Sequence, residues 1–266
     1  MVGALAVLAA APPGLAQTAA APVAAAGGQV LRDPAEKENR KAFAVGMRLD
    51  RAVLAPLAHA YLRVATPPVA GALGRAIHNL DEPRIAGNDL LQGHPRRAAS
   101  AGARFVLNAT VGVGGLLDPA GQLGLRRHES DFGQTLGRYG VGPGPYGFMP
   151  LFGPGDARDG AGQIVDLLSD PLMWATGGLT TTFSRARRWT SAAQARVDVD
   201  GQMIALNRDF VDPYAALRAA YSQQRAQMVR RARGEPDAAA VQDLPDFDPP
   251  SAPQPQSSPD PGVPSP

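Results

Sequence analysis

Apolar residues from Glu36 onward repeat at intervals of three and four, which is the period of an amphipathic helix. The positions that carry this repeat over 36–64 are Phe43, Met47, Leu54, Leu57 and Tyr61. Pro56 lies inside the stretch and has no amide hydrogen, so the pattern predicts a helix that is kinked or split there.

A second helix is expected to begin at Thr66 and Pro67, because threonine caps helices and proline suits their first turn. The Asp81-Glu82-Pro83 sequence is expected to end it. Further helices are expected over 84–92, 95–109, 158–169, 182–207 (with a break at 200–201) and from 212 onward. No pair of alternating strand segments is visible, which favours an all-α fold.

Residues 137–155 do not fit a helical pattern. Glycine and proline make up more than half of the segment, yet it contains several large apolar side chains. These are Tyr139, Tyr146, Phe148, Met149, Leu151 and Phe152. A solvated linker does not need such side chains, whereas a loop that packs on protein or enters lipid does. An ordinary buried Ω-loop is the alternative.

The two ends differ from the middle in composition. Residues 1–31 carry no charge, and a short apolar core followed by Gly14-Leu15-Ala16 is typical of a signal peptide with its cleavage site, although the usual basic start is missing. An Ala-rich leader is the alternative. Residues 234–266 are rich in proline and acidic side chains and are predicted to be disordered. The expected organisation is therefore 1–31 signal peptide and spacer, 32–233 helical domain and 234–266 tail.

The charge of the middle favours an anionic partner. Residues 32–234 hold all 26 basic residues and 18 of the 24 acidic ones, a net charge of +8. Lipid headgroups fit this balance. Nucleic acid is not expected, because the basic residues are scattered and few aromatic residues lie among them. No later run reaches the roughly 18 apolar residues that a spanning helix needs, so contact with a bilayer would be interfacial or as an embedded bundle.

Catalytic patterns are weak, and neither an enzyme nor a cofactor is predicted. The chain has no cysteine, and its four histidines lack metal-ligand spacing. In the His128-Glu129-Ser130-Asp131 sequence, Ser130 or Asp131 is better explained as a helix cap. The glycines over 111–116 lack the lysine and the serine or threonine of a phosphate loop, which favours a turn between helices.

Short motifs follow one another from Asp33 to Arg231. They include Asn39-Arg40-Lys41-Ala42-Phe43, Asn79-Leu80-Asp81-Glu82-Pro83, the stretches 88–93, 104–110, 112–118 and 131–137, and Asp212-Pro213-Tyr214. In order and spacing this set resembles the MlaA (VacJ) family, the outer-membrane component of the system that maintains lipid asymmetry in Gram-negative bacteria.

The resemblance implies a ring-like helical bundle in the inner leaflet of the outer membrane, with a central amphipathic channel open to the periplasm. It implies that phospholipids misplaced in the outer leaflet enter this channel and pass to a soluble periplasmic carrier, MlaC. It also implies association with trimeric porins.

The Gly/Pro/aromatic segment falls on the family's hairpin beside the channel, and we expect Gly140–Pro154 to form the channel wall or gate. Its candidate residues are Gly140, Gly142, Gly144, Pro145, Tyr146, Gly147, Phe148, Pro150, Phe152, Gly153 and Pro154. The glycines and prolines would shape a non-helical turn, and the aromatic side chains would face lipid tails or the bundle.

Two features depart from the family pattern. The family is usually anchored by a lipidated N-terminal cysteine, and this chain has none, so either embedding alone retains it or it is bound more loosely. The family tends to have an aromatic residue where this chain has Glu38. It tends to have Phe-x-Phe-Asn where this chain has Phe43-Ala44-Val45-Gly46. Porin association is therefore less expected than lipid handling, and a soluble periplasmic lipid-binding module is the alternative function.

Overall fold

The computed structural model describes residues 30–170 and 178–235. These residues belong to one compact unit of the chain. The predicted signal peptide, nearly all of its spacer and the predicted tail from 236 lie outside the described residues.

The described part of the chain is almost wholly helical, which confirms the all-α prediction apart from two short strands. The helices are α2 (Glu36–Leu49), the π-helical turn η3 (Asp50–Leu54), α3 (Ala55–Val64), α4 (Pro67–Leu91), α5 (Pro95–Thr110), α6 (Pro119–Gln122), α7 (Phe132–Arg138), α8 (Ala157–Leu168), α10 (Gly178–Asp198), α11 (Asp200–Asp209) and α12 (Pro213–Arg233). The strands are β1 (Tyr146–Met149) and β2 (Gly153–Asp156).

The first predicted helix is split, as Pro56 led us to expect. The wide π turn of η3 separates α2 from α3, and Pro56 occupies the first turn of α3, where its missing amide hydrogen matters least. Asp50 opens the π turn and is buried, and both of its carboxylate oxygens accept hydrogen bonds from Arg196 at 2.5 and 3.0 Å. The turn is therefore fixed to α10.

The predicted end of the second helix at Asp81-Glu82-Pro83 is wrong, because α4 continues through Pro83 to Leu91. Proline deprives one carbonyl of its hydrogen bond. Here the neighbouring residues outweigh that loss: Ile85 is buried, and the buried Glu82 accepts a hydrogen bond from Arg104 of α5 at 2.7 Å. Tertiary packing thus carries the helix past a residue that ends helices in isolation.

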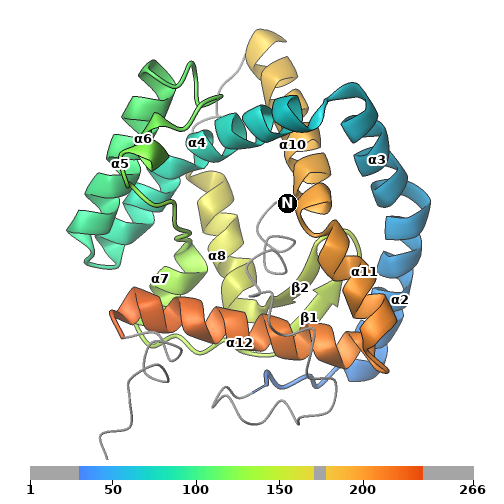
Figure 1. The fold of residues 1–266 in the computed structure, drawn as a ribbon. Helices are drawn as coiled ribbons and strands as arrows, with labels where there is room; N and C mark the ends of the chain where they lie inside the picture. Colours follow the sequence, from blue (N-terminus) through green and yellow to red (C-terminus); the bar gives the residue numbers. More distant parts are fainter. Residues whose placement is uncertain (1–29, 171–177, 236–266) are drawn as a thin grey trace, which may run out of the picture. The chain divides into compact units, whose positions relative to one another are not determined.

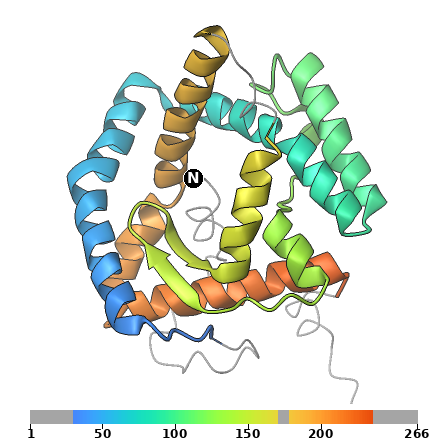
Figure 2. The same cartoon turned by 180° about the vertical axis from the view of Figure 1, so that it is seen from behind.

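Within this unit the helices form a closed circuit of packed neighbours (Figures 1 and 2). Helices α3 and α4 both contact α10, and α4 also contacts α5 and α7. The circuit continues from α7 to α12 and from α12 to α11 and β2, while β1 packs on α2. The hydrophobic core lies where α2, α11, α12 and the strands meet, and its buried members are Tyr146, Phe148, Val199, Met203, Leu206, Tyr214, Leu217 and Tyr221.

Strands β1 and β2 form an antiparallel hairpin in which Tyr146 pairs with Asp156 and Met149 with Gly153. The expectation of no paired strands was therefore wrong at this place. Each strand is only four residues long and includes glycine, so no alternating pattern marks it in the sequence. Leu151 and Gly153 take left-handed backbone conformations in the turn, which is uncommon for a leucine.

Aspartates begin several helices. The N-caps Asp118, Asp131, Asp156 and Asp212 each accept a hydrogen bond from the amide three residues on. Of the two predicted caps at the start of α7, Asp131 is the one the structure uses. Thr66 precedes α4 as expected, but its side chain makes no capping bond. The predicted break near Asp200 is confirmed one residue earlier, at Val199.

Candidate functional site

The hairpin divides into a buried base and an exposed tip. Tyr146 and Phe148 of β1 are buried, with the Phe148 ring edge-on to Phe43 at 5.4 Å and Tyr146 edge-on to Tyr214 at 6.1 Å. The aromatic side chains of β1 thus face the bundle, one of the two directions expected from the sequence.

The tip residues face outward. Met149 is 55% exposed, and Leu151 and Phe152 are also exposed. Of the remaining predicted site residues, Gly140, Gly142, Gly144 and Pro145 are exposed, Gly147, Pro150 and Gly153 are half-buried, and Pro154 is buried. The most exposed parts of the predicted segment are therefore its tip and its glycine-rich entry.

Asn39 of α2 holds the outer edge of β1. Its side-chain nitrogen donates to Asp33 at 2.7 Å and to the carbonyl of Tyr146 at 3.3 Å, and its side-chain oxygen accepts from the amide of Phe148 at 3.1 Å. The amide of Tyr146 donates to the carbonyl of Arg32 at 2.9 Å. These bonds occupy the ladder positions that a third strand would fill.

A stripe of alternating tyrosine and arginine along α12 contacts carboxylates on both sides of the hairpin base. Its members are Tyr214, Arg218, Tyr221 and Arg225. Their spacing of four, three and four residues places them on one helix face. At one end of this stripe, Tyr214 donates to Asp33 and Arg218 to the same carboxylate.

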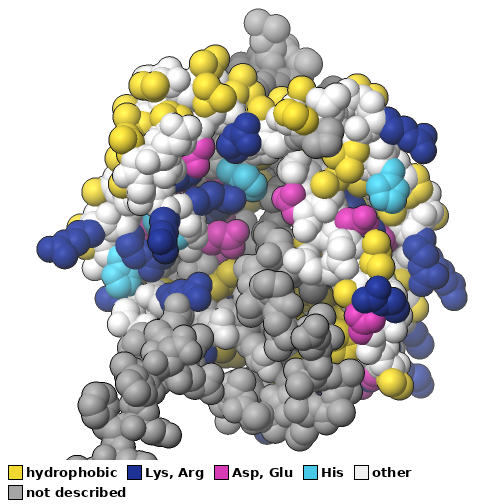
Figure 3. All heavy atoms as spheres, in the orientation of Figure 1, with side chains coloured by type: hydrophobic (Ala, Val, Ile, Leu, Met, Phe, Trp, Pro, Cys, Tyr) yellow, Lys and Arg dark blue, Asp and Glu magenta, His cyan; other side chains and the backbone are white. Residues whose placement is uncertain are grey.

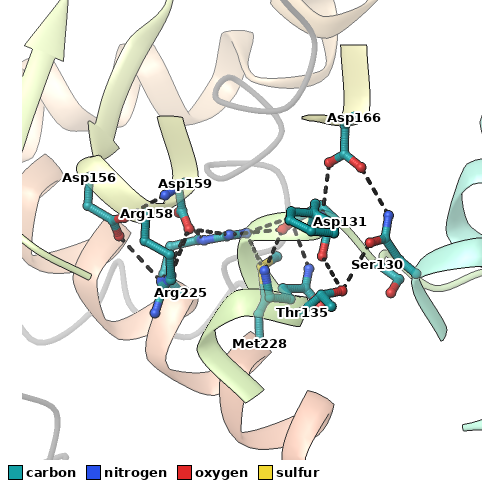
Figure 4. Close-up of polar contacts among 12 residues, drawn as sticks. Ser130, Asp131, Thr135, Asp156, Arg158, Asp159, Asp166, Arg225 and Met228 are labelled. Atoms are coloured by element: carbon teal, nitrogen blue, oxygen red, sulfur yellow. Dashed lines mark hydrogen bonds and ion pairs between the residues drawn. The ribbon is translucent and has the colours of Figure 1, made fainter. Parts of the chain in front are cut away.

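The other end of the stripe meets the junction between β2 and α8 (Figure 4). Tyr221 donates to Asp159 at 2.6 Å and to Asp156 at 3.3 Å. Arg225 reaches Asp159 at 2.6 Å and Asp131 of α7 at 2.8 and 3.1 Å. Asp156 is at once the last residue of β2 and the cap of α8, so α12, α7, α8 and the hairpin are joined at one buried cluster.

The carboxylates of this cluster differ in acidity. Burial disfavours the charge of Asp131, but the Arg225 guanidinium outweighs it and lowers the pKa of Asp131 to about 2. Burial and the neighbouring Asp159 raise the pKa of Asp156 to about 6. Burial, Asp159 and Asp156 together raise the pKa of the Tyr221 hydroxyl far above its ordinary value, so it stays a donor.

A second polar network continues from this cluster toward α4 (Figure 4). Asp166 of α8 accepts from Asn88 and from the amide of Phe132, both at 3.0 Å. Gln92 donates to Ser130 at 2.9 Å and to Thr135 at 3.0 Å. The interior around α7 is therefore polar and hydrogen-bonded.

Large apolar side chains lie on the outside instead. On α8, Ile164, Leu167 and Leu168 are exposed, whereas Arg158 and Asp159 of the same helix are buried. Others gather near the end of α5 and around α6, where Figure 3 shows a concentration of hydrophobic side chains. These are Val106, Val111, Val113, Leu116, Leu117 and Leu123. This distribution inverts that of an ordinary water-soluble helix.

None of the described helices has both the length and the apolar character to cross a bilayer. Among the described residues there is also no group of His, Cys, Asp and Glu that could hold a metal ion. His128 contacts Asp89 at 2.5 Å, and His94 contacts the carbonyl of Ala232 at 2.8 Å. The glycines over 112–115 form a tight turn, with the amides of Gly114 and Gly115 bonded to carbonyls of α5.

Sequence reasoning missed the residues that fix the hairpin. Arg218 and Arg225 both lie in the stripe and bind carboxylates. Asn39 belonged to a motif without an assigned role. The available signal was the Tyr/Arg alternation at helical spacing, which needs buried acidic partners that sequence alone does not place.

Comparison with known proteins agrees with this fold. A model of the family described as MlaA lipoprotein matches residues 31–228. The "Intermembrane phospholipid transport system lipoprotein MlaA" of Shigella flexneri is 35% identical over 230 residues, covering 81% of this chain and 88% of the relative. The protein of the same name from Escherichia coli (strain K12) is 34% identical with the same coverage.

An uncharacterized protein of Rickettsia bellii is 36% identical over 199 residues, covering 74% of this chain and 77% of the relative. A solved structure described as "Structural basis for maintenance of bacterial outer membrane lipid asymmetry" superposes with a TM-score of 0.62 at 33% identity, covering 74% of this chain and 98% of that chain. The chain therefore belongs to the MlaA lipoprotein family.

Proposed function

We propose that this protein removes misplaced phospholipids from the outer leaflet of the outer membrane and passes them to a periplasmic carrier. Relatives at about 35% identity are named as components of an intermembrane phospholipid transport system, which supports this class of function. The protein would work from the inner leaflet, facing the periplasm. Lipid transfer of this kind makes and breaks no covalent bond, so no catalytic group or cofactor is required.

The observation that carries the proposal is the inverted polarity of α8. Its exposed face is built from Ile164, Leu167 and Leu168, while Arg158 and Asp159 are buried in the ion-pair cluster. Exposed apolar faces of this kind mark contacts with lipid or with another apolar surface. The hairpin tip adds Met149 and Phe152 to the apolar surface.

In this proposal, acyl chains contact the hairpin tip and α8 while the headgroup stays in a polar environment. Residues 140–154 form the wall or gate of a channel, and the lipid leaves toward the soluble carrier MlaC. Trimeric porins would hold the protein in the membrane plane. The altered α2 sequence, with Glu38 and the Phe43–Gly46 stretch, makes the porin contact the less supported part.

A transfer assay tests the proposal. Vesicles with a fluorescent phospholipid and the purified protein are mixed with the carrier, and loading of the carrier is measured. The double variant Leu151→Ser/Phe152→Ser should lose most of the transfer, because both apolar side chains of the tip become polar. Val211→Ser, at a fully exposed apolar position between α11 and α12, is the matched control and should keep it. Equal transfer by both variants would rule out the tip as lipid contact.

Fractionation of the native envelope separates transport in the membrane from the alternative function. Retention in the outer membrane after salt and carbonate washes, with phospholipid bound to the purified protein, is the expected result. Release into the soluble periplasm would favour a soluble lipid-binding module that has lost membrane embedding.

A further inference from the structure

Every hydrogen bond and ion pair described above for the hairpin is made by its base. On the outer edge, Asn39 bonds the backbone of Tyr146 and Phe148. On the inner edge, Asp156 ends β2 and caps α8. The entry is tied as well, because the amide of Arg158 donates to the carbonyl of Pro143 at 3.1 Å. Movement of the whole hairpin would have to break all of these contacts together.

Both edges of the hairpin are connected to α12 by side-chain hydrogen bonds. Asn39 is bonded to Asp33, which receives Tyr214 and Arg218 of α12. At the opposite edge, Tyr221 of α12 donates to Asp156, and Arg225 donates to Asp159. The four stripe residues therefore hold the two edges at a fixed separation along α12. Because Asp156 and Asp159 are buried and Asp33 is partly buried, water weakens these bonds less than it weakens surface ion pairs.

The tip lacks comparable restraints. Met149, Leu151 and Phe152 are exposed, and the bonds described for this turn are local ones from the amide of Phe152 to the carbonyls of Met149 and Pro150. The turn also contains the left-handed Leu151, a conformation that is less favourable for leucine than for glycine. Among the described residues, the tip thus makes only local hydrogen bonds, although Pro150 lies beside Gly46 of α2.

We infer that Tyr214, Arg218, Tyr221 and Arg225 are positioning residues that fix the hairpin base to α12, so that lipid-driven movement is confined to the tip, residues 149–153. This inference rests on the proposed function for the identity of the lipid ligand. Gly140 and Gly144 of the entry have left-handed backbones, which fits a role in shaping the turn.

The chain has no native cysteine, so cysteine pairs for spin labels can be introduced into the full-length protein without other changes. Gly147→Cys reports on the base, because a side chain there meets no atom within 4 Å. Leu151→Cys reports on the tip. Each is paired with Gln227→Cys on the exposed side of α12, and distances are measured by pulsed electron spin resonance. Vesicles of phosphatidylethanolamine and phosphatidylglycerol are the lipid probe.

The base-to-α12 distance should be narrowly distributed and unchanged by vesicles, whereas the tip-to-α12 distance should shift or broaden. In Tyr214→Phe/Tyr221→Phe the base distribution should broaden without vesicles. Losing a hydrogen bond from a tyrosine hydroxyl to a carboxylate should raise the fraction of molecules in which the hairpin base is detached from α12 by roughly tenfold. Gln223→Ala, at a half-exposed position of α12, should leave it narrow, and circular dichroism should show equal helicity.

A base that moves together with the tip on adding vesicles would overturn the inference, as would a tip that does not respond. A narrow base distribution in the double phenylalanine variant would overturn the role of the tyrosines. The base-to-α12 distance can be measured without any transfer of lipid to the carrier. Failed carrier loading with the expected distances would therefore count against the proposed function alone.

Discussion

The hydroxyl of Tyr221 donates to the carboxylate of Asp159 across 2.6 Å, which joins the middle of α12 to the first turn of α8. Asp159 also accepts hydrogen bonds from Arg158 and Arg225. A neutral donor and two cations thus share one buried acid. The arrangement leaves Asp156, its neighbour, less well compensated, and this asymmetry leads to the first two predictions.

Asp156→Asn should leave the free energy of unfolding at pH 7.5 unchanged or raise it by up to about 3 kcal/mol. The pKa of Asp156 is raised to about 6, so the folded state disfavours its charge, and asparagine keeps the capping bond to α8. Asp131→Asn should have the opposite effect, a loss of about 2 kcal/mol, because the pKa of Asp131 is lowered to about 2 by Arg225. Urea unfolding of both variants measures this, and a large loss in Asp156→Asn would contradict it.

The pH dependence of stability should carry the same two contributions with opposite signs. The folded pKa of Asp156 is about 6, against an ordinary value of 3.8, so its contribution to stability is greatest below about pH 4 and is lost as the pH rises through 6. The Asp131 contribution is present above about pH 4 and is lost as the pH falls toward 2. The free energy of unfolding, measured from pH 3.5 to 7, should therefore fall with rising pH in the wild type and should not show this fall in Asp156→Asn.

Arg104→Met should lower the free energy of unfolding by about 3 to 5 kcal/mol, since it leaves the buried Glu82 without its cation. Removing both charges in Glu82→Leu/Arg104→Met should lower it by clearly less than the two single variants together. A double-mutant cycle by denaturant unfolding gives the coupling. Additive losses would mean that the pair is not the contact that matters at this place.

Two glycines of the hairpin region should respond differently to alanine. Gly144 has a left-handed backbone, and a Cβ there would lie 3.0 Å from that of Ala157, so Gly144→Ala should lower the free energy of unfolding by about 1 to 2 kcal/mol. Gly147 faces open space, and Gly147→Ala should stay within about 0.5 kcal/mol of the wild type. Thermal unfolding distinguishes them, and equal losses would argue against the hairpin conformation.

Ile164→Ser/Leu168→Ser should weaken retention in the membrane without altering the free energy of unfolding by more than about 0.5 kcal/mol. Both side chains are exposed, so little packing is lost. Gln163→Ser, exposed on the same helix, is the control. Retention measured by carbonate extraction should fall only in the double variant, and unchanged retention would remove α8 from the lipid-contact surface.

Helices with periodic apolar residues and clear caps were predictable from the sequence. α8 begins one residue before the expected start, and α12 begins at Pro213 after its Asp212 cap. Pro83 misled us because local propensity contains no information about Glu82 and its partner in α5. The strands were missed because each is only four residues long and contains glycine, so neither shows an alternating pattern.

The candidate site was only partly predictable. Composition singled out residues 137–155, and the family resemblance pointed to 140–154, but the division into a buried base and an exposed tip depends on contacts with α2 and α12. An apolar stripe such as Ile164, Leu167 and Leu168 normally turns toward a core. They are exposed because the opposite face of α8 is taken by ion pairs.

Strand β2 ends at Asp156 and α8 begins at Ala157, with no loop residue between them. A loop would let strand and helix change direction independently, whereas a direct junction transmits torque. A rotation of the hairpin base would therefore act directly on the first turn of α8. The exposed face of α8, with Ile164, Leu167 and Leu168, would then change its direction relative to its surroundings.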